Sequence, residues 1–222
     1  MAPSERVLMR GRTGKLGTVH KGVIRSLPPA RFVLADHQIL SVIKSGDLQV
    51  SPFEAEMIRP AALSLRLGAE ASVLGAAQAV DARDLDTYPR LTPRLPDALG
   101  RLVVNPGEVL LAPTMEKVAI SNRLTGILDG ISDVARLGIS VVLSQQVSPG
   151  YGWPDGAILT LEIVSRLPVP VMLYPGTRIC NLMLMRCGRP AKSYSSMLHN
   201  HSRDVGAMPS NWHAYHKQPQ PS

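Results

Sequence analysis

One stretch of the chain, LDGISDVARLG at residues 128–138, combines small residues with a single arginine. Small residues beside Arg136 are typical of an anion site, because such a loop exposes backbone N–H groups and the guanidinium supplies positive charge. Ile131 and Asp133, however, stand where an anion site needs hydrogen-bond donors, and an aspartate repels a phosphate at close range. The stretch is therefore a poor phosphate-binding loop, and its residues alone leave its ligand open.

Histidines gather near the C-terminus and raise the question of a metal site. His199 and His201 lie in HNHSRD, and His213 and His216 lie in HAYH. Imidazole is a common zinc ligand, but histidines in a polar tail are more often solvent-exposed than held in a rigid ligand set. We predict no metal site and no cofactor, with Mg²⁺ needed only if the substrate is phosphorylated. These histidines are better candidates for a lid over a site.

Composition and charge narrow the class of protein. The chain has 222 residues, of which 45% are hydrophobic and only 4% aromatic, so we expect one domain with an aliphatic core. Most of the net charge of +7 lies in residues 1–31, where seven basic residues stand against one acidic residue. A basic arm can bind nucleic acid, but this arm lacks aromatic residues that would stack on bases. Packing on a neighbouring subunit is the favoured interpretation.

The location of the protein is predicted from two negative features of the sequence. No run of about 18 apolar residues and no signal-peptide core is found, so we expect a cytoplasmic protein without a membrane span. Only two cysteines occur, Cys180 and Cys187, and we interpret both as ordinary thiols of a reducing compartment.

The elements that must position the candidate residues are mostly short strands. A helix is expected at 36–46, with Asp36 as its N-cap and Gly46 as its stop. Alternation of apolar residues predicts a strand near 61–67, and residues 81–100 are expected to form a loop or irregular excursion. Further strands are predicted at 101–104, 109–120, 124–128, 138–147, 157–165, 169–174 and 178–187. Many short strands separated by turns indicate an all-β sandwich or barrel.

Five motifs in a fixed order give the chain a family resemblance. They are IRPAALSLRLG, NPGEVLLAPTMEKVAI, LDGISDVARLGI, SPGYGWPDGAILTLEIVS and LPVPVMLYPGTRICNLM. In this order they resemble the dCTP deaminase branch of the dUTPase/dCTP deaminase superfamily. The resemblance implies a mainly β subunit, a distorted β-barrel or jelly-roll with a few short helices, assembled as a homotrimer with active sites between subunits. It divides the chain into a basic arm at 1–31, a β domain at 32–210 and a flexible tail at 211–222.

The resemblance also implies deamination without zinc. The zinc-deaminase signature, H-x-E followed by P-C-x-x-C, is absent, and Cys180 and Cys187 have the wrong spacing for it. In the family a glutamate activates the water, and it corresponds to Glu162. Arg136 corresponds to the arginine that fixes the glutamate and the base, and Ser132 to the serine that contacts the amino group. Without the resemblance, Glu162 is an outward-facing strand carboxylate, Arg136 a partner of some neighbouring carboxylate, and Ser132 a turn residue.

The departures from the family pattern concern the phosphates and the sugar. Ile131 replaces a triphosphate-binding arginine, Asp133 replaces a serine, and Ser148 replaces the aspartate that meets the sugar 3′-hydroxyl. The family's C-terminal lid, KYxxQxG, aligns with NHSRDVG at 200–206, and its phosphate ligands are replaced. We expect the following residues to bind substrate: Gly130, Ile131, Asp133, Val142, Ser144, Gln145 and Tyr194.

The sequence therefore predicts a zinc-independent, deaminase-like hydrolase acting on a cytosine-type or related amino-substituted ring. Its substrate is expected to be a nucleoside, nucleotide or related heterocycle, and not a standard nucleoside triphosphate. Three alternatives stay open: dCTP deaminase proper, other acid–base chemistry in the same pocket, and a trimeric binding protein without turnover. A dUTPase-like pyrophosphatase is disfavoured, because residues 143–148, LSQQVS, offer no carboxylate to activate water.

Overall fold

The computed structural model describes residues 32–188, 190, 192–197, 201, 206 and 208–212. The chain divides into two units, Met1–Arg31 and Phe32–Ser222, and the described residues all belong to the second. The basic arm predicted at 1–31 lies outside the described residues, as do His199, His213 and His216. No helix within the described ranges is long and apolar enough to cross a membrane.

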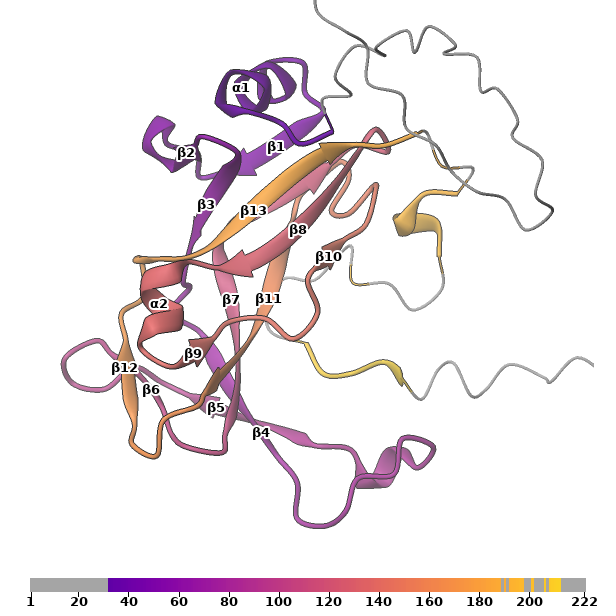
Figure 1. The fold of residues 1–222 in the computed structure, drawn as a ribbon. Helices are drawn as coiled ribbons and strands as arrows, with labels where there is room; N and C mark the ends of the chain where they lie inside the picture. The colour runs from indigo at the N-terminus through magenta and orange to yellow at the C-terminus, as the bar shows by residue number, and fades with distance from the viewer. Residues whose placement is uncertain are drawn as a thin grey trace, which may run out of the picture. The chain divides into compact units, whose positions relative to one another are not determined.

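Three antiparallel sheets make up most of the described unit (Figure 1). The six-stranded sheet contains β5 (Arg90–Arg94), β4 (Ala71–Gly75), β7 (Val109–Ile120), β11 (Ala157–Ser165) and β9 (Ile139–Ser140) in that order, and β1 (Leu48–Ser51) also pairs with β7. The five-stranded sheet runs β10 (Gln146–Val147), β8 (Leu124–Gly130), β13 (Arg178–Arg186), β3 (Ala62–Arg66) and β2 (Ile58–Arg59). The third sheet pairs β12 (Val171–Leu173) with β6 (Leu102–Val104).

Helical elements are few and short. Helix α1 (Asp36–Lys44) buries Ile39 and Val42, and helix α2 (Ser132–Arg136) follows β8 directly. Single 3-10 turns form at η1 (Ala55–Met57), η2 (Leu85–Thr87) and η3 (Tyr194–Ser196). The prediction of a mainly β protein with a few short helices is confirmed.

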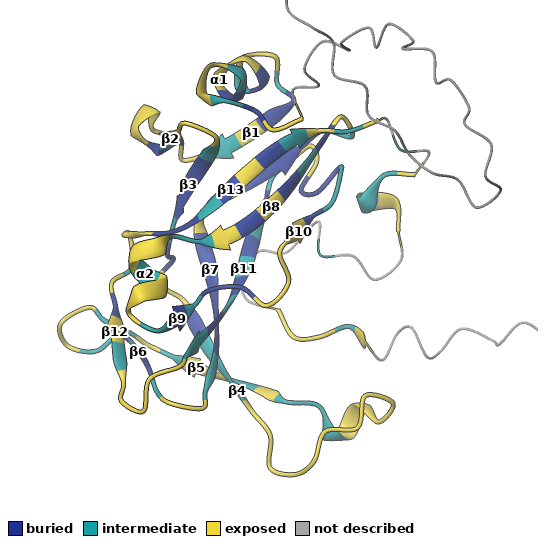
Figure 2. Cartoon of the chain, viewed as in Figure 1, coloured by how far each residue is buried: buried dark blue, intermediate teal, exposed yellow. Residues whose placement is uncertain are grey.

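The core lies between the inner faces of the two larger sheets, and the alternation of side chains decides which residues reach it. In β11, Leu159, Leu161 and Ile163 are buried, so Thr160 and Glu162 lie on the opposite, partly exposed face. Figure 2 shows the same alternation as dark and light segments along β8 and β13. The aliphatic core predicted from the composition is confirmed, because Tyr151 is the one aromatic residue among the buried hydrophobic residues described.

Three local predictions need correction. Helix α1 starts one residue early: Asp36 is its first residue and Ala35 is the N-cap, whose N–H is accepted by the Gln38 side chain at 3.0 Å. Within the excursion at 81–100, residues 90–94 form strand β5, because they pair with β4 along its whole length. The single strand expected at 138–147 is in fact two short strands, β9 and β10. Residues 141–145, between them, do not form a strand.

The loop that joins β4 to β5 projects from the six-stranded sheet (Figure 1). Local hydrogen bonds hold this loop. The Asp84 side chain accepts the Asp86 N–H at 3.1 Å at the start of η2, and the Tyr88 hydroxyl donates to the Ala82 carbonyl at 2.7 Å. These bonds fix Tyr88 and Pro89 at the base of the loop, where they line the cavity described below.

The turn between β10 and β11 must pass close to β7. Gly152 has φ +65°, and a Cβ there would overlap the carbonyl oxygen of Val118, so only glycine fits. The same turn presents Tyr151, whose hydroxyl donates to the Ile158 carbonyl at 2.7 Å and whose carbonyl accepts the Ile120 N–H at 2.9 Å. The glycine thus lets Tyr151 pack into the structure next to β11.

Candidate functional site

A cavity of about 440 Å³ opens beside β11. Its walls come from β10 and the turn after it, from the β4–β5 hairpin, and from described residues of the C-terminal segment. The polar residues that line it are Ser144, Gln146, Ser148, Thr160, His201 and Ser210, together with tyrosines 88, 151 and 194. Leucines of β4, β7, β8 and β11 form the apolar part of the wall.

Among the described residues that line the cavity, Glu162 is the one that carries a carboxylate. The backbone N–H of Leu143 donates to its Oε2 at 3.0 Å, so one oxygen is fixed by the 141–145 segment. Because strand alternation places Thr160 on the same face of β11, both side chains face the same side as the cavity. A carboxylate held by one oxygen beside a cavity can take a proton from a bound water with the other.

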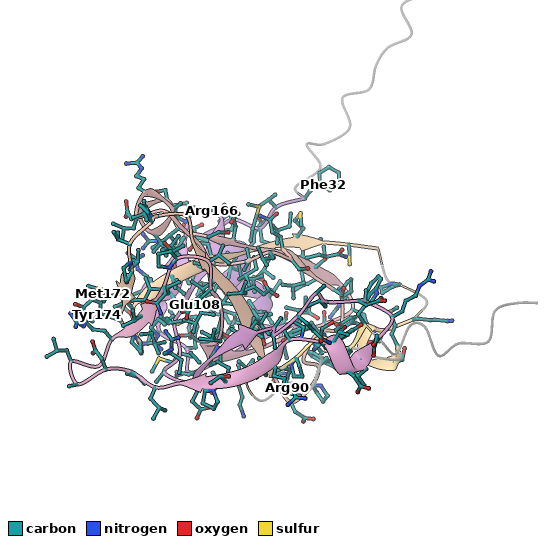
Figure 3. All side chains as sticks on the ribbon, turned by 90° about the horizontal axis from the view of Figure 1, so that it is seen from below. Phe32, Arg90, Glu108, Arg166, Met172 and Tyr174 are labelled. Carbon is teal, nitrogen blue, oxygen red and sulfur yellow. The ribbon has the colours of Figure 1, made fainter. Side chains whose placement is uncertain are left out.

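No lysine or arginine occurs among the described residues that line the cavity. Proteins bind phosphate groups through lysine and arginine side chains and through backbone N–H groups, and the charged side chains bind most strongly. A second hollow of about 310 Å³ shares Tyr88, Pro89, Pro209 and Ser210 with the cavity and includes Arg90 and Asp86, which have opposite charges. Figure 3 shows Arg90 well apart from the exposed Met172 and Tyr174 at the end of β12.

Two tyrosines form an aromatic wall. The rings of Tyr151 and Tyr194 are stacked, with centroids 6.1 Å apart and planes inclined by 26°. The Tyr194 N–H donates to the Pro149 carbonyl at 3.1 Å, and the Tyr194 hydroxyl accepts the backbone N–H of His201 at 3.0 Å. The C-terminal segment is thereby tied to the β10–β11 turn, and its tyrosine offers a flat apolar surface to a heterocyclic ring.

The predicted site residues separate into two groups. Glu162, Ser144 and Tyr194 line the cavity. Gln145 is exposed beside it, and Val142 is only 7% exposed because its side chain packs in the core. Gly130 ends β8, while Ile131, Ser132, Asp133 and Arg136 belong to α2 and its N-cap, none of them in the cavity lining described.

The candidate site residues on helix α2 are exposed on the surface of the subunit. The helix contains no buried residue, and Ser132, Asp133 and Arg136 are all exposed (Figure 2). Figure 1 shows α2 across the fold from β10 and η3, which flank the cavity. In the part of the chain that the structure describes, the Arg136 guanidinium has no ion-pair partner. Within one chain, Arg136 and Ser132 therefore do not meet Glu162.

Several cavity residues were not among the predicted site residues. Thr160 could have been predicted from the sequence, because it lies two residues before Glu162 on a predicted strand and so shares its face. Gln146 lies in the segment 138–147, which was predicted as one strand, and Ser148 and Tyr151 lie in the turn that follows it. Tyr88 lies in the excursion, and only the folded β4–β5 hairpin brings it to the cavity.

Neither cysteine fits a catalytic or metal-binding role. Burial raises the pKa of the Cys180 thiol far above its usual range, and the nearby carboxylates of Glu116 and Asp129 raise it further. Burial also raises the pKa of Cys187. A thiol must ionise to act as nucleophile or metal ligand, so both residues are poor candidates. No group of three potential metal ligands comes together among the described residues.

Comparison with known proteins identifies the family and agrees with the fold. The family model described as dCTP deaminase-like matches residues 33–187. A dCTP deaminase, dUMP-forming, of Methanopyrus kandleri is 34% identical over 192 residues, covering 82% of this chain and 96% of that protein. A dCTP deaminase, dUMP-forming, of Persephonella marina is 30% identical over 163 residues, covering 73% of this chain and 88% of that protein.

Among solved structures, the 2′-deoxycytidine 5′-triphosphate deaminase of Agrobacterium tumefaciens shares the fold, with a TM-score of 0.53 at 22% sequence identity. The match covers 70% of this chain and 48% of that chain, so this chain spans about half the length of that protein. The protein is a β-rich, deaminase-like enzyme, a hydrolase of C–N bonds. It belongs to the dCTP deaminase-like family, as the order of its motifs predicted.

Proposed function

We propose that the protein deaminates a cytosine-type ring, or a related amino-substituted ring, in a substrate without a triphosphate, using water activated by Glu162. The observation that carries the proposal is the cavity itself. It holds one fixed carboxylate, an aromatic wall and small polar groups, and its described lining includes no lysine or arginine. Such a lining suits a neutral heterocycle better than a polyanion.

The chemistry follows from the carboxylate. Glu162 accepts a proton from a water molecule, and the resulting hydroxide adds to the ring carbon that bears the amino group. As the hydroxide adds, the electron pair of the ring C=N bond moves to the ring nitrogen. The amino group takes up a proton and leaves as ammonia, and the hydroxyl proton passes to the ring nitrogen as the carbon becomes a carbonyl. The Leu143 N–H holds one oxygen of Glu162 in place and leaves its second oxygen available for the water. Overall, one water is consumed and one ammonia is released.

The positions that differ from the family pattern support a changed substrate. Ser148 lines the cavity where the resemblance implies an aspartate for the sugar hydroxyl. Ile131 and Asp133 stand at the α2 N-terminus where it implies triphosphate contacts, and replacing an arginine by isoleucine removes the cation. The groups that the resemblance assigns to the reacting carbon, Glu162, Arg136 and Ser132, are all kept.

The site is proposed to be completed by a second copy of the chain in a homotrimer. Arg136 and Ser132 are exposed on α2 and do not line the cavity of their own chain. In a ring of identical subunits, the α2 of one chain can meet the cavity of the next, because such head-to-tail contacts repeat around the ring. This arrangement would bring the guanidinium beside the neighbour's Glu162.

A substrate panel tests the proposed function directly. Purified protein is incubated with cytosine, cytidine, deoxycytidine and dCTP with Mg²⁺, and ammonia and products are quantified. We expect turnover of an unphosphorylated probe and turnover of dCTP lower by about 100-fold in kcat/KM, the loss expected when buried phosphate partners are missing. Efficient conversion of dCTP to dUMP, the reaction in the relatives' names, would establish dCTP deaminase proper instead.

Mixed oligomers test the shared site. Glu162→Gln and Arg136→Gln chains are each expected to be nearly inactive alone. After co-refolding in equal amounts, about one quarter of the sites pair an intact Glu162 with an intact Arg136, so activity should recover to about a quarter of the wild-type level. Recovery is measured with the best probe of the panel. A mixture that stays as inactive as its parents would place both residues in the site of one chain, whereas an active Arg136→Gln parent would remove Arg136 from the chemistry.

A further inference from the structure

His201 is the one histidine among the described residues that line the cavity. Its backbone N–H donates to the Tyr194 hydroxyl at 3.0 Å, and Tyr194 is in turn bonded to Pro149 and stacked on Tyr151. Gly206, the next described residue along the chain, accepts a hydrogen bond from the Thr160 hydroxyl at 3.4 Å, on the face of β11 that also presents Glu162. The first bond holds the His201 backbone at the cavity wall, and the second holds Gly206 beside β11.

The other titratable groups of the described cavity lining come from four elements. Glu162 lies on β11, Tyr194 on η3, Tyr151 on the β10–β11 turn and Tyr88 at the base of the β4–β5 hairpin. Tyrosine titrates near pH 10 in the absence of strong perturbation, and histidine near pH 6.5. Among the side-chain types of this lining, histidine is the one whose ordinary pKa lies near neutral pH.

We propose that His201 is a second acid–base residue of this site, which donates a proton to the amino group as it leaves the ring. The inference rests on the proposed function and extends it. It is drawn from the position of His201 in the same cavity as Glu162, and from the need of a leaving amine for a proton.

The proton balance closes without any further reactant. Glu162 removes one proton from water as the C–O bond forms, and the imidazolium of His201 gives one proton to the nitrogen as the C–N bond breaks. Ammonia leaves with the electron pair of that bond. Transfer of the proton held by Glu162 to His201, directly or through water, restores both groups for the next turnover. Splitting the two transfers between two groups lets each keep the protonation state that its own step needs.

A titration without substrate tests the shared position. The ring proton of His201 is followed by NMR in the full-length protein and assigned by its loss in His201→Asn. Because a nearby carboxylate favours imidazolium, Glu162→Gln should lower the pKa of His201 by about half a unit or more. Glu56→Gln, which removes an exposed carboxylate from η1, is the matched control and should leave it unchanged. An unchanged pKa in Glu162→Gln overturns the inference.

The pH dependence of turnover tests the role. With the best probe of the panel, wild-type kcat/KM should fall on the acidic side as Glu162 is protonated and on the alkaline side as His201 loses its proton. His201→Asn should lower kcat/KM by about 100-fold and remove the alkaline fall. His37→Asn, which changes an exposed histidine of α1 outside the cavity lining, should keep both limbs. A His201→Asn profile that keeps the alkaline fall, or loses no activity, overturns the role.

The two proposals fail in different ways. If Glu162→Gln turns over the probe as fast as wild type, the proposed function is wrong whatever His201 does. If no probe is turned over at all, both the function and the role of His201 fail, even where the titration shows the two groups to be close. If only the His201→Asn profile is unchanged, Glu162 acts without a histidine and the proposed function stands.

Discussion

Replacing Glu162 by glutamine is expected to reduce deamination by about 1,000-fold while leaving the fold intact, because glutamine cannot take a proton from water. The amide oxygen of glutamine can still accept the Leu143 N–H that Glu162 Oε2 accepts at 3.0 Å, so the 141–145 segment should keep its place. Ammonia release with the best probe gives the activity, and thermal unfolding at a fixed protein concentration gives the stability.

The matched control for this substitution is Glu56→Gln, which changes an exposed glutamate on η1 and should alter neither quantity. Two results would contradict the assignment. Full activity in Glu162→Gln would mean that Glu162 is an ordinary strand carboxylate beside the cavity and takes no part in the reaction. A large loss of stability together with activity would mean that its hydrogen bond to Leu143 holds the structure.

Replacing Glu116 by alanine is expected to destabilise the fold by about 3–5 kcal/mol, the usual result of removing one partner of a buried ion pair. Glu116 is fully buried in β7, and its two oxygens accept the Arg66 Nε–H at 2.6 Å and the Arg66 backbone N–H at 2.8 Å. The hydrogen bond that Arg66 donates to this carboxylate is the main reason that the pKa of Arg66 is raised. Urea unfolding at constant protein concentration measures the loss.

The position of this pair explains the size of the effect. Arg66 ends β3 of the five-stranded sheet, and Glu116 lies in β7 of the six-stranded sheet, so the pair joins the two sheets that enclose the core. Glu54 pairs with the same arginine through Nη1 at 2.8 Å, but its side chain is 53% exposed. Glu54→Gln is therefore the control and should cost less than about 1 kcal/mol. Equal losses in the two variants would show that the sheets do not depend on Glu116.

Much of the fold was predictable because it depends on local periodicity. Apolar residues alternate in 157–165 and 178–187, and both segments are strands in the structure. Helix α1 followed from its apolar face and from Gly46, which has φ +77° just after the helix end. Strand β5 was missed because Arg90–Arg94 shows no apolar alternation and is a strand only through its pairing with β4.

For the site, the sequence named several of the residues but not where the fold places all of them. Glu162 was named from an ordered motif, Ser144 and Tyr194 from the family resemblance outside the motifs, and all three line one cavity. Residues 128–138 were expected to begin as a loop, but β8 runs through to Gly130 and α2 starts at Ser132. This sharp change from strand to helix turns Arg136 and Ser132 outward, away from the chain's own cavity. Motif order identified these residues, but it could not say which surface they would occupy.

The sequence by itself determined the type of element, the family and the carboxylate, because these depend on residue types and on spacings of a few positions. Only the tertiary structure decided which distant residues meet. It brought Tyr88 from the hairpin, Tyr151 from a glycine-dependent turn and His201 from the C-terminal segment to the face of β11 that presents Glu162. The physical reason is that such contacts join segments far apart in the chain, and they form only when strand pairing and core packing have fixed the backbone that presents them.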